Sequence, residues 1–362
     1  MVLILNSGSS SIKYKLFHTN TNKIIFSSII ENVQEFHQAF KDIFDRLIQM
    51  KYIDKISDIQ AFGHRVVHGG EKFNKPVIIN QNVIDEIKNL IPLAPLHNPA
   101  NLDGILTVFK LVPDAIQVAV FDTAFHQSIP KEAYIYPISY KFYEKYGIRK
   151  YGFHGTSHHY IAKQTAKHLN KPLNSLNLIT IHLGNGDSIT AIKNGISIDT
   201  SMGFTPLEGL MMGTRCGDID PEIVLYLENT IGIDPKEVDN ILNKQSGLKG
   251  ICDKNDLRDI IKDAKNKDEK AILAIDMFCY RIKKYIGSYK EILGDIDAIV
   301  FTGGIGENSP LIREKTITNI DKIKNNNIKN SGEIQNDKSP YKILVIPTDE
   351  ELEIAIQTKK LL

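Results

Sequence analysis

Two strand–turn–strand patterns constrain the fold of this chain more than any other feature of its sequence. Residues 2–5 form an apolar run, residues 6–11 a turn of small residues, and residues 12–17 an alternating apolar and polar segment. Residues 176–192 repeat this order near the middle of the chain. Apolar runs joined by Gly, Asn and Ser are typical of paired strands. In a chain of 362 residues, two such units predict two related α/β lobes rather than two unrelated domains.

The remaining segments fit the same α/β interpretation. Periodic apolar positions predict a helix at the C-terminus and helices over residues 33–50, 84–91 and 99–109. Apolar runs predict further strands over residues 59–67, 115–121, 298–301 and 342–346. The aromatic and basic stretch 139–152 is interpreted as a crossing between the lobes, and the Asn- and Lys-rich stretch 319–338 as a solvated loop.

Composition and charge exclude several classes of protein. The net charge is +1, which disfavours a nucleic-acid-binding protein because such a protein needs a basic excess. No segment approaches the roughly 18 unbroken apolar residues of a membrane helix, and the short run 2–5 does not fit a signal peptide. The three cysteines, Cys216, Cys252 and Cys279, form neither a disulfide framework nor a CxxC zinc pair. We therefore expect a cytoplasmic protein that binds neither nucleic acid nor a membrane.

Three small-residue turns, residues 6–11, 183–188 and 303–308, each follow an apolar strand. One such turn is more often an ordinary hairpin. Three in one chain favour phosphate binding, because glycine lets the backbone approach a ligand and backbone N–H groups can surround phosphate oxygens. None of the turns is a Walker A loop, and the sequence Gly304-Ile305-Gly306 lacks the third glycine of a dinucleotide fingerprint.

Several basic side chains near these turns are candidates for the chemistry. Lys13 follows the first turn and can point back to its mouth, although a surface lysine is an equally good interpretation. Arg65 and Arg215 lie in glycine-bearing segments, where arginine suits bidentate binding of carboxylate or phosphate better than a solvated position. His154 and His182 flank glycine-rich turns and can donate to a transferring phosphoryl group.

Two acidic residues and two further histidines complete the candidates. Asp122 follows the predicted strand 115–121, at the edge where ligands bind in α/β sheets. Glu350 follows the last predicted strand and could approach a hydrated Mg²⁺. His64 and His68 have the spacing of a helical zinc pair, but their segment is predicted as a strand, so a metal site is the weaker interpretation.

The candidate residues lie in long, specific motifs that run through nearly the whole chain. The motifs are LNSGSSSIKYKLF at residue 5, GHRVVHGGEKF at 63, PLAPLHNPANL at 92, VFDTAFHQSIP at 120, YGFHGTSHHY at 151, HLGNGDSI at 182, DTSMGFTPLEGLMMGTRCGDIDP at 199, FTGGIGENSP at 301 and IPTDEE at 346. In these motifs the chain resembles the acetate kinase family, of the superfamily of acetate and sugar kinases, Hsp70 and actin. Butyrate kinases look less similar in the same segments.

The resemblance implies an α/β fold of two RNase H-like lobes, as in actin-like ATPases, with a central active-site cleft. It implies a discontinuous N-terminal lobe over residues 1–126 plus 353–362, for acetate and phosphate, and a C-terminal lobe over residues 127–352, for the nucleotide. The implied reaction is reversible transfer of the γ-phosphoryl group of ATP to acetate with Mg²⁺ or Mn²⁺, giving acetyl phosphate and ADP. The implied assembly is a homodimer.

The matching positions imply a role for each candidate residue. Asp122, His154, Arg65 and Arg215 would be catalytic, and acetate would be surrounded by Arg65, Val67, Leu96, Phe153 and Pro206. ATP would contact Lys13, His182, Leu183, Gly184, Asn185, Gly186, Asp256, Leu257, Arg258, Gly304, Ile305, Gly306, Glu307 and Asn308. Asn6 and Glu350 would contact the magnesium ion.

The role of Asp122 can be judged on chemical grounds. Acetate is already ionised at neutral pH, because carboxylic acids titrate near pH 4. Its oxygen therefore needs no general base before it attacks phosphorus. We expect Asp122 to orient Arg65 or Arg215 and the magnesium shell rather than to accept a proton.

Three positions depart from the family's pattern, and three other functions compete. Asp187, Cys216 and Asp349 replace the usual residues, and Asp187 is expected to add negative charge near the phosphates. Propionate kinase is a close alternative, because one methylene changes binding by only ~1–3 kcal/mol. A non-enzymatic nucleotide switch of the actin or Hsp70 type would not need Arg65 or His154. A nicotinamide dehydrogenase is disfavoured by the missing glycine fingerprint.

Overall fold

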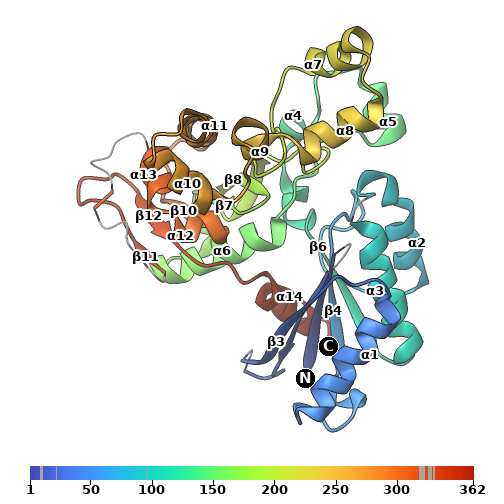
Figure 1. Cartoon of the computed structure of the whole chain (residues 1–362). Coiled ribbons are helices and arrows are strands. Elements are labelled where there is room, and N and C mark those ends of the chain that lie inside the picture. Colours follow the sequence, from blue (N-terminus) through green and yellow to red (C-terminus); the bar gives the residue numbers. More distant parts are fainter. Residues whose placement is uncertain (9–10, 22, 96, 318–322, 325–327, 329–330) are drawn as a thin grey trace. The chain divides into compact units, whose positions relative to one another are not determined.

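The computed structural model describes residues 1–8, 11–21, 23–95, 97–317, 323–324, 328 and 331–362. The chain forms two compact units, each built on its own six-stranded sheet (Figure 1). Unit 1 comprises Met1–Gln127, Gly155–Tyr160 and Asp349–Leu362, and unit 2 comprises Ser128–His154 and Ile161–Thr348. The stretch 139–152 therefore lies within unit 2, and its interpretation as a crossing is wrong. Arg149 of this stretch is buried in that unit, where its guanidinium lies 3.5 Å from the ring centre of Tyr134, whereas Tyr140 and Tyr146 are exposed.

The sheet of unit 1 has the strand order β3-β2-β1-β4-β6-β5. Its strands are β1 (Val2–Ser7), β2 (Ser11–Phe17), β3 (Ile24–Glu31), β4 (Ala61–Val66), β5 (Val77–Ile78) and β6 (Ile116–Phe121). β1 runs antiparallel to β2 and parallel to β4, and β4 runs parallel to β6. Helices α1 (Phe36–Gln49), α2 (Gln81–Asn89) and α3 (Asn98–Leu111) cover one face. Helix α14 (Glu350–Lys359) covers the other face, where Ile354 packs against Val2 and Ile4.

The sheet of unit 2 has the strand order β11-β12-β10-β7-β8-β9. Its strands are β7 (Leu178–Leu183), β8 (Asp187–Lys193), β9 (Ile196–Thr200), β10 (Ala298–Thr302), β11 (Gly332–Glu333) and β12 (Lys342–Val345). Read from the other edge, this order repeats that of unit 1: an antiparallel meander of three strands, then two parallel strands and a short edge strand. The prediction of two related α/β lobes is confirmed.

The long helix α11 (Glu269–Leu293) forms the centre of the helical layer of unit 2. Together with α9 (Gly247–Cys252), α10 (Leu257–Lys265) and α13 (Pro310–Thr316), it packs on β7, β8 and β10 through one hydrophobic core (Figure 1). The remaining helices are α4 (Lys131–Tyr134), α5 (Lys141–Tyr146), α6 (Gly155–Leu169), α7 (Pro221–Tyr226), α8 (Pro235–Lys244) and α12 (Gly303–Asn308). Helix α6 begins in unit 1 and continues in unit 2.

Most of the predicted elements are present, with bounds shifted by a few residues, but one turn is wrong. Residues 303–308 form helix α12 instead of a turn. Gly303 has a left-handed backbone conformation, φ +77°, which lets the chain leave β10 and enter the helix without a connecting loop. The Glu307 side chain stabilises this entry by accepting a hydrogen bond of 2.9 Å from the Gly303 N–H. Most of the predicted solvated loop 319–338 lies outside the described residues.

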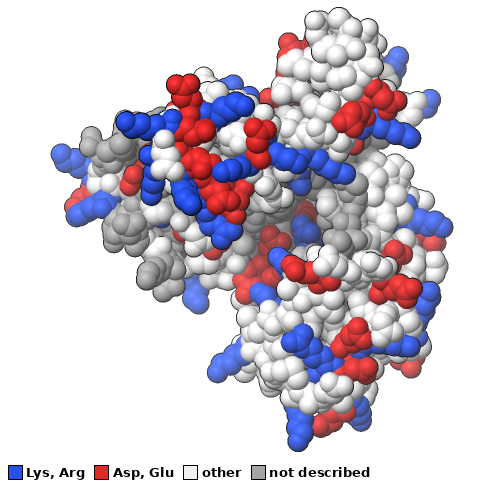
Figure 2. Space-filling view, viewed as in Figure 1, with Lys and Arg blue, Asp and Glu red and all other residues white. Residues whose placement is uncertain are grey.

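One face of the molecule and the helices can be compared with the expectations on charge and membrane spans. On the face drawn in Figure 2, Lys and Arg are interspersed with Asp and Glu. Among the described residues, no helix is long and apolar enough to cross a membrane.

Candidate active site

The candidate residues of unit 1 gather where parallel strands end. Arg65 lies near the end of β4, and Asp122 follows β6, the strand that pairs with β4. The carboxyl ends of parallel neighbours share one edge of a sheet, which brings the two side chains together as an ion pair between Arg65 Nη2 and Asp122 Oδ2. The other carboxylate oxygen, Asp122 Oδ1, accepts a hydrogen bond of 2.9 Å from Thr156 Oγ1, at the start of α6.

The Arg65 guanidinium lies between two carboxylates, and one of its N–H groups makes no hydrogen bond to the described residues. Its Nε lies 3.6 Å from Glu350 Oε2 and has no hydrogen-bond partner among the described residues, although it is buried. Burial alone would lower the pKa of Arg65, but the carboxylates of Asp122 and Glu350 raise it above its usual range. Burial in turn raises the pKa of Glu350 to about 7. A buried, unsatisfied N–H next to a permanent charge is suited to binding an anion.

Glu350 is flanked by two acidic residues that a lysine of β2 holds in place. Lys15 Nζ lies 2.8 Å from Asp349 Oδ1 and 3.1 Å from Glu351 Oε2. Asp349 also caps α14 by accepting a hydrogen bond of 3.1 Å from the Leu352 N–H. Although Asp349 replaces the residue usual in the family at this position, the helix therefore still has a capping side chain. Lys15 was not among the predicted site residues. The alternation of apolar and polar residues along β2 is the local pattern that indicates which face of the sheet its side chain lies on.

The first turn and the segment after β4 are tied together by α3. Asn101 Nδ2 donates to the Ser7 carbonyl at 2.7 Å, and its Oδ1 accepts from the Val67 N–H at 3.0 Å. This arrangement buries Val67. Asn6 lies opposite Lys13 in the register of β1 and β2. Leu96, predicted beside acetate, lies outside the described residues, as do Ser9 and Ser10 of the turn.

In unit 2, His154 is held in a strained and specific position. It precedes α6 with a left-handed backbone, φ +55°, which is uncommon for a residue other than glycine. Its ring stacks on that of His182 with 4.5 Å between the ring centres. His154 Nδ1 lies 2.8 Å from Ser188 Oγ. This contact fixes the ring, and the sequence analysis recognised Ser188 only as part of a turn.

Arg215 is brought to the same turn. A β-carbon placed on Gly186 would lie 3.3 Å from Arg215 Nη1 and 3.4 Å from His154 Cε1, so both side chains approach this turn on the side that the glycine leaves open. Arg215 Nη1 donates to the Pro206 carbonyl at 3.2 Å. Burial lowers the pKa of Arg215, and Asp187 partly offsets this.

Asp187 does not add a charge to the phosphate-binding turn in the way expected. Its side chain is fully buried, and Oδ1 accepts a hydrogen bond of 2.7 Å from the Gly184 N–H, which closes the turn. Burial raises the pKa of Asp187 well above its ordinary value and so favours the neutral acid. The residue therefore stabilises the turn from within instead of presenting a carboxylate to a ligand.

A cavity of about 640 Å³ in unit 2 collects residues from three predicted nucleotide segments. It lies among β7, α10 and α12 and is lined by Gly184, Asn185, Asn255, Asp256, Leu257, Arg258, Ile261, Gly304, Ile305, Asn308 and Ser309. Asn255, Ile261 and Ser309 were missed by the sequence analysis. Ile261 lies one helical turn after Leu257 on α10, and this periodicity is the signal that could have found it.

Six residues predicted to contact ATP do not line this cavity. They are Lys13, which belongs to unit 1, and His182, Leu183, Gly186, Gly306 and Glu307 of unit 2. Leu183 is fully buried in the core. Glu307 Oε1 accepts from the N–H groups of Gly303 and Thr348 at 2.9 and 3.1 Å, which commits this oxygen to holding α12.

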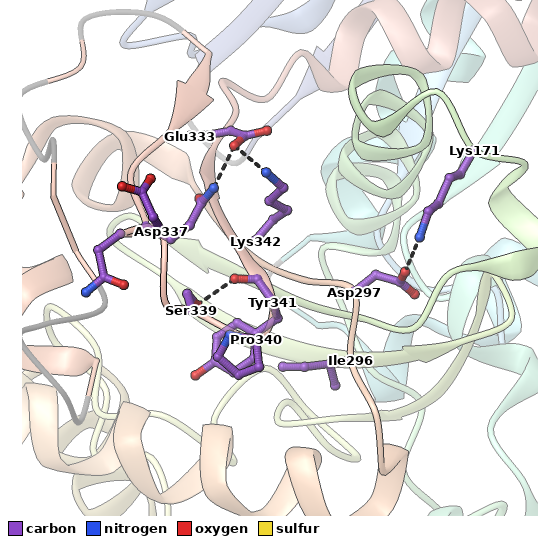
Figure 3. Close-up of a pocket in the computed structure, with 11 residues that line it drawn as sticks. Lys171, Ile296, Asp297, Glu333, Asp337, Ser339, Pro340, Tyr341 and Lys342 are labelled. Atoms are coloured by element: carbon purple, nitrogen blue, oxygen red, sulfur yellow. Dashed lines mark hydrogen bonds and ion pairs between the residues drawn. The ribbon is translucent and has the colours of Figure 1, made fainter.

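A second cavity of about 510 Å³ lies at the other end of the same sheet (Figure 3). Four of its charged side chains pair with one another, Lys171 with Asp297 at 2.8 Å and Lys342 with Glu333 at 2.7 Å, and Asp337 pairs with Lys324 outside the lining. None of the predicted site residues lines it. The first cavity is therefore the better candidate for a ligand.

His64 on β4 and His68, two residues after that strand, are both buried, so neither side chain is open to a ligand from solvent. Burial lowers the pKa of both His64 and His68 to about 4. His68 Nδ1 accepts from the Gly70 N–H at 3.0 Å. In the part of the chain that the structure describes, no three His, Cys, Asp or Glu side chains are grouped to hold a metal ion.

Comparison with known sequences gives matches that cover most or all of the chain. A model of the acetokinase family matches residues 31–356. The acetate kinase of Sulfurovum sp. is 50% identical, over 99% of this chain and 98% of its own length. The acetate kinase of Caldicellulosiruptor saccharolyticus is 49% identical, over 100% of this chain and 99% of its own length.

Solved structures agree with these matches. The acetate kinase of Porphyromonas gingivalis superposes with a TM-score of 0.94 at 40% identity, and 99% of each chain is covered. A propionate kinase from Francisella tularensis superposes equally well, with a TM-score of 0.94 at 43% identity over 100% of this chain and 99% of that one. The expected two-lobe actin-like ATPase fold is therefore confirmed.

Proposed function

This chain belongs to the acetokinase family, and we propose that it transfers the γ-phosphoryl group of ATP to acetate, reversibly, giving ADP and acetyl phosphate. The observation that carries this proposal is the cavity in unit 2, where the end of β7, the start of α10 and α12 come together. All three segments were predicted to contact ATP. The names of the full-length relatives support acetate as the acceptor.

The reaction needs positioning and charge neutralisation rather than proton transfer. Acetate is ionised at neutral pH, since its carboxyl group titrates near pH 4. One acetate oxygen attacks the γ-phosphorus, and the bond from that phosphorus to the bridging oxygen of ADP breaks, with its electron pair leaving on ADP. The three equatorial oxygens carry the charge that the protein must stabilise.

In unit 1, Arg65 is the residue suited to bind the attacking carboxylate. Its ion pair with Asp122 fixes the guanidinium, and its unsatisfied Nε supplies a donor. Asp122 is therefore an orienting residue with both carboxylate oxygens engaged. Val67 is buried next to this position in the sequence and supplies an apolar surface suited to the acetate methyl group.

In unit 2, Arg215 and His154 are the residues suited to the transferring phosphoryl group. Both contact the turn that carries Gly186. The stacking of His154 on His182 and its contact with Ser188 hold the ring in one orientation, so no reorganisation is required when negative charge develops. Phe153 precedes His154, and the Pro206 carbonyl accepts a hydrogen bond of 3.2 Å from Arg215 Nη1; both residues have apolar side chains suited to the acetate methyl group.

The chemistry of two residues in unit 1 fits a bound divalent cation. Asn6 offers an amide oxygen and Glu350 a carboxylate, and oxygen donors are what Mg²⁺ and Mn²⁺ prefer. The buried Glu350 carboxylate, whose pKa is raised, would be stabilised in its ionised form by a nearby cation. We propose that these two residues hold the metal, which supplies neutralisation of phosphate charge when bound.

Two further points of the proposal concern the acceptor and the assembly. Propionate is the alternative acceptor, because the propionate kinase structure matches this chain as well as the acetate kinase structure does. A homodimer is supported by apolar side chains of α7 that are exposed in the single chain, among them Ile223, Leu225 and Tyr226.

The test is ATP-dependent acyl hydroxamate formation with acetate, propionate and butyrate under identical conditions. We expect acetate to give the highest kcat/KM, propionate a value lower by about tenfold, and butyrate a lower value still. A kcat/KM for propionate that exceeds the value for acetate would show that propionate is the preferred acceptor. No hydroxamate from any of the three acids would contradict the proposed function.

A further inference from the structure

A partly buried polar cluster of Tyr136, Lys150 and Glu208 lies behind the loop that carries Pro206 and Arg215. Tyr136 Oη donates a short hydrogen bond to Glu208 Oε2 and accepts one of 2.8 Å from the Phe204 N–H. Lys150 Nζ lies 3.1 Å from Glu208 Oε1 and donates to the Thr200 carbonyl at 2.8 Å. Each oxygen of the Glu208 carboxylate is thus held by a different partner. The cluster joins the segment before Phe153 to the loop after β9, entirely within unit 2.

The missing side chain of Gly203 makes room for this cluster. Gly203 lies directly under it, and a β-carbon at that position would collide with the Glu208 carboxylate and the Tyr136 hydroxyl. The carbonyl of Gly203 also accepts from the N–H groups of Tyr151 and Gly152, at 3.0 and 3.2 Å. Side chains and backbone therefore fix residues 203–208 against the segment that leads into Phe153 and His154.

Behind this loop there is space rather than packing. A cavity of about 320 Å³ is lined by Tyr136, Phe204, Thr205, Leu207 and Glu208, together with residues of the next loop. A loop with a cavity on one side lacks the close contacts that normally hold backbone in place. The hydrogen bonds of Tyr136 and Glu208 therefore have a larger share in fixing it.

The backbone of Arg215 is held separately, which makes the effect of the cluster selective. The Met212 N–H donates to the Arg215 carbonyl at 3.1 Å, and the Ser246 N–H donates to the Thr214 carbonyl at 3.0 Å. The Arg215 guanidinium, in contrast, depends on the loop through the hydrogen bond of 3.2 Å from Nη1 to the Pro206 carbonyl, and the same Nη1 lies 3.5 Å from Met212 Sδ. A shift of residues 203–208 would move Pro206 and tilt the guanidinium without dislodging the loop that carries Arg215.

We propose that Glu208 is a positioning residue for the carboxylate substrate, which acts with Tyr136 and Lys150 to fix Pro206 and the Arg215 guanidinium. This inference rests on the proposed function, which assigns Pro206 to acetate and Arg215 to the transferring phosphoryl group. None of the cluster's residues lines the cavity proposed for the nucleotide. Loss of the cluster should therefore raise the KM for acetate and lower kcat, and leave the KM for ATP unchanged.

The experiment is steady-state kinetics of Glu208→Gln in the full chain, with each substrate varied at saturation of the other. The glutamine removes the charge that pairs with Lys150 and keeps the size of the side chain. We expect the KM for acetate to rise about tenfold and the KM for ATP to stay within about twofold. Tyr136→Phe should also raise the KM for acetate. This variant provides the test if Glu208→Gln does not fold.

Variants at two further positions, 150 and 333, separate positioning from a general effect on stability. Lys150→Arg keeps a cation and should retain a KM for acetate closer to wild type than Lys150→Met does. Glu333→Gln removes an ion pair of the same kind at the remote cavity of Figure 3, where Glu333 lies 2.7 Å from Lys342. This matched control should leave both KM values unchanged.

The outcomes distinguish this inference from the proposed function. An active wild type whose Glu208→Gln and Tyr136→Phe variants keep the wild-type KM for acetate overturns the positioning role alone. Equal losses for both substrates, with a lower melting temperature, show a merely structural cluster and also overturn it. A wild type that forms no acyl phosphate overturns the proposed function and this inference with it.

Discussion

The two oxygens of Asp122 are both engaged, one by Arg65 and one by Thr156. A general base needs a lone pair directed at the proton that it accepts, and the acceptor proposed here has no such proton at neutral pH. The buried carboxylate instead fixes the guanidinium that would bind acetate. At the scale of the residue, orientation accounts for the geometry better than proton transfer does.

Asp122→Asn tests this role. Removing one partner of a buried, hydrogen-bonded charge pair leaves the other uncompensated, so we expect kcat/KM for acetate to fall by about 10²-fold or more. The pH–rate profile should keep both of its limbs, because no proton is transferred. A variant profile that has lost one limb would identify Asp122 as a proton acceptor. Thr156→Val, which removes only the second hydrogen bond, serves as the control and should cost about tenfold or less.

The sequence identified chemically distinctive residues but few of the residues that hold them. Arg65, His154 and Arg215 stand out because glycines lie near them in the sequence, and Asp122 stands out because it follows a continuous apolar strand. Thr156 is separated from Asp122 by 34 residues, and Ser188 is separated from His154 by the same distance. Such partners meet only after the chain has folded, and no local pattern marks them. The expectation for Asp187 failed for a similar reason, since burial and not residue type decides its charge.

At the scale of the element, the predictions were best where apolar runs are long. β1, β4, β6, β7, β10 and β12 were all predicted, because strands covered on both faces consist of continuous apolar residues. β3 was missed because most of its residues are only partly buried and its sequence lacks a clear core face. Helix α12 was missed because glycine and asparagine favour a turn, and its stability comes from contacts with Glu307 and Arg313 that lie outside local propensity.

Gly303→Ala tests whether the entry into α12 determines nucleotide binding. The left-handed conformation of Gly303 strains any other residue, and the added β-carbon would press on the Leu183 carbonyl. We expect the free energy of unfolding to fall by about 2 kcal/mol or more and the KM for ATP to rise. Gly287→Ala in α11 is the matched control, because nothing lies within 4 Å of its β-carbon position. It should leave the KM for ATP unchanged and stabilise the chain by about 0.5–1 kcal/mol. Equal KM values for ATP in wild type and Gly303→Ala would contradict the role of this entry.

At the scale of the whole molecule, the repeated strand–turn–strand pattern gave the architecture before any motif was recognised. Both sheets have the same strand order when read from their three-stranded antiparallel edges. The same repeat places a glycine-rich turn after the first strand of each unit. What the sequence did not indicate is that Gly155–Tyr160, a part of one helix, belongs with unit 1 while the rest of α6 belongs with unit 2. Such a division depends on contacts made far along the chain, so periodicity alone does not reveal it.

The central claim is that an acetate oxygen attacks the phosphoryl group that ATP supplies, so that the bridging oxygen of acetyl phosphate comes from acetate. It is tested most directly by incubating the enzyme with ATP, Mg²⁺ and acetate labelled with ¹⁸O in both carboxylate positions. The ³¹P resonance of the acetyl phosphate formed then reports on its bridging oxygen. The account predicts that this oxygen carries the label in wild type and that Arg65→Gln forms acetyl phosphate much more slowly. Acetyl phosphate with an unlabelled bridging oxygen, or ATP consumed at the same rate without acetate, would contradict it.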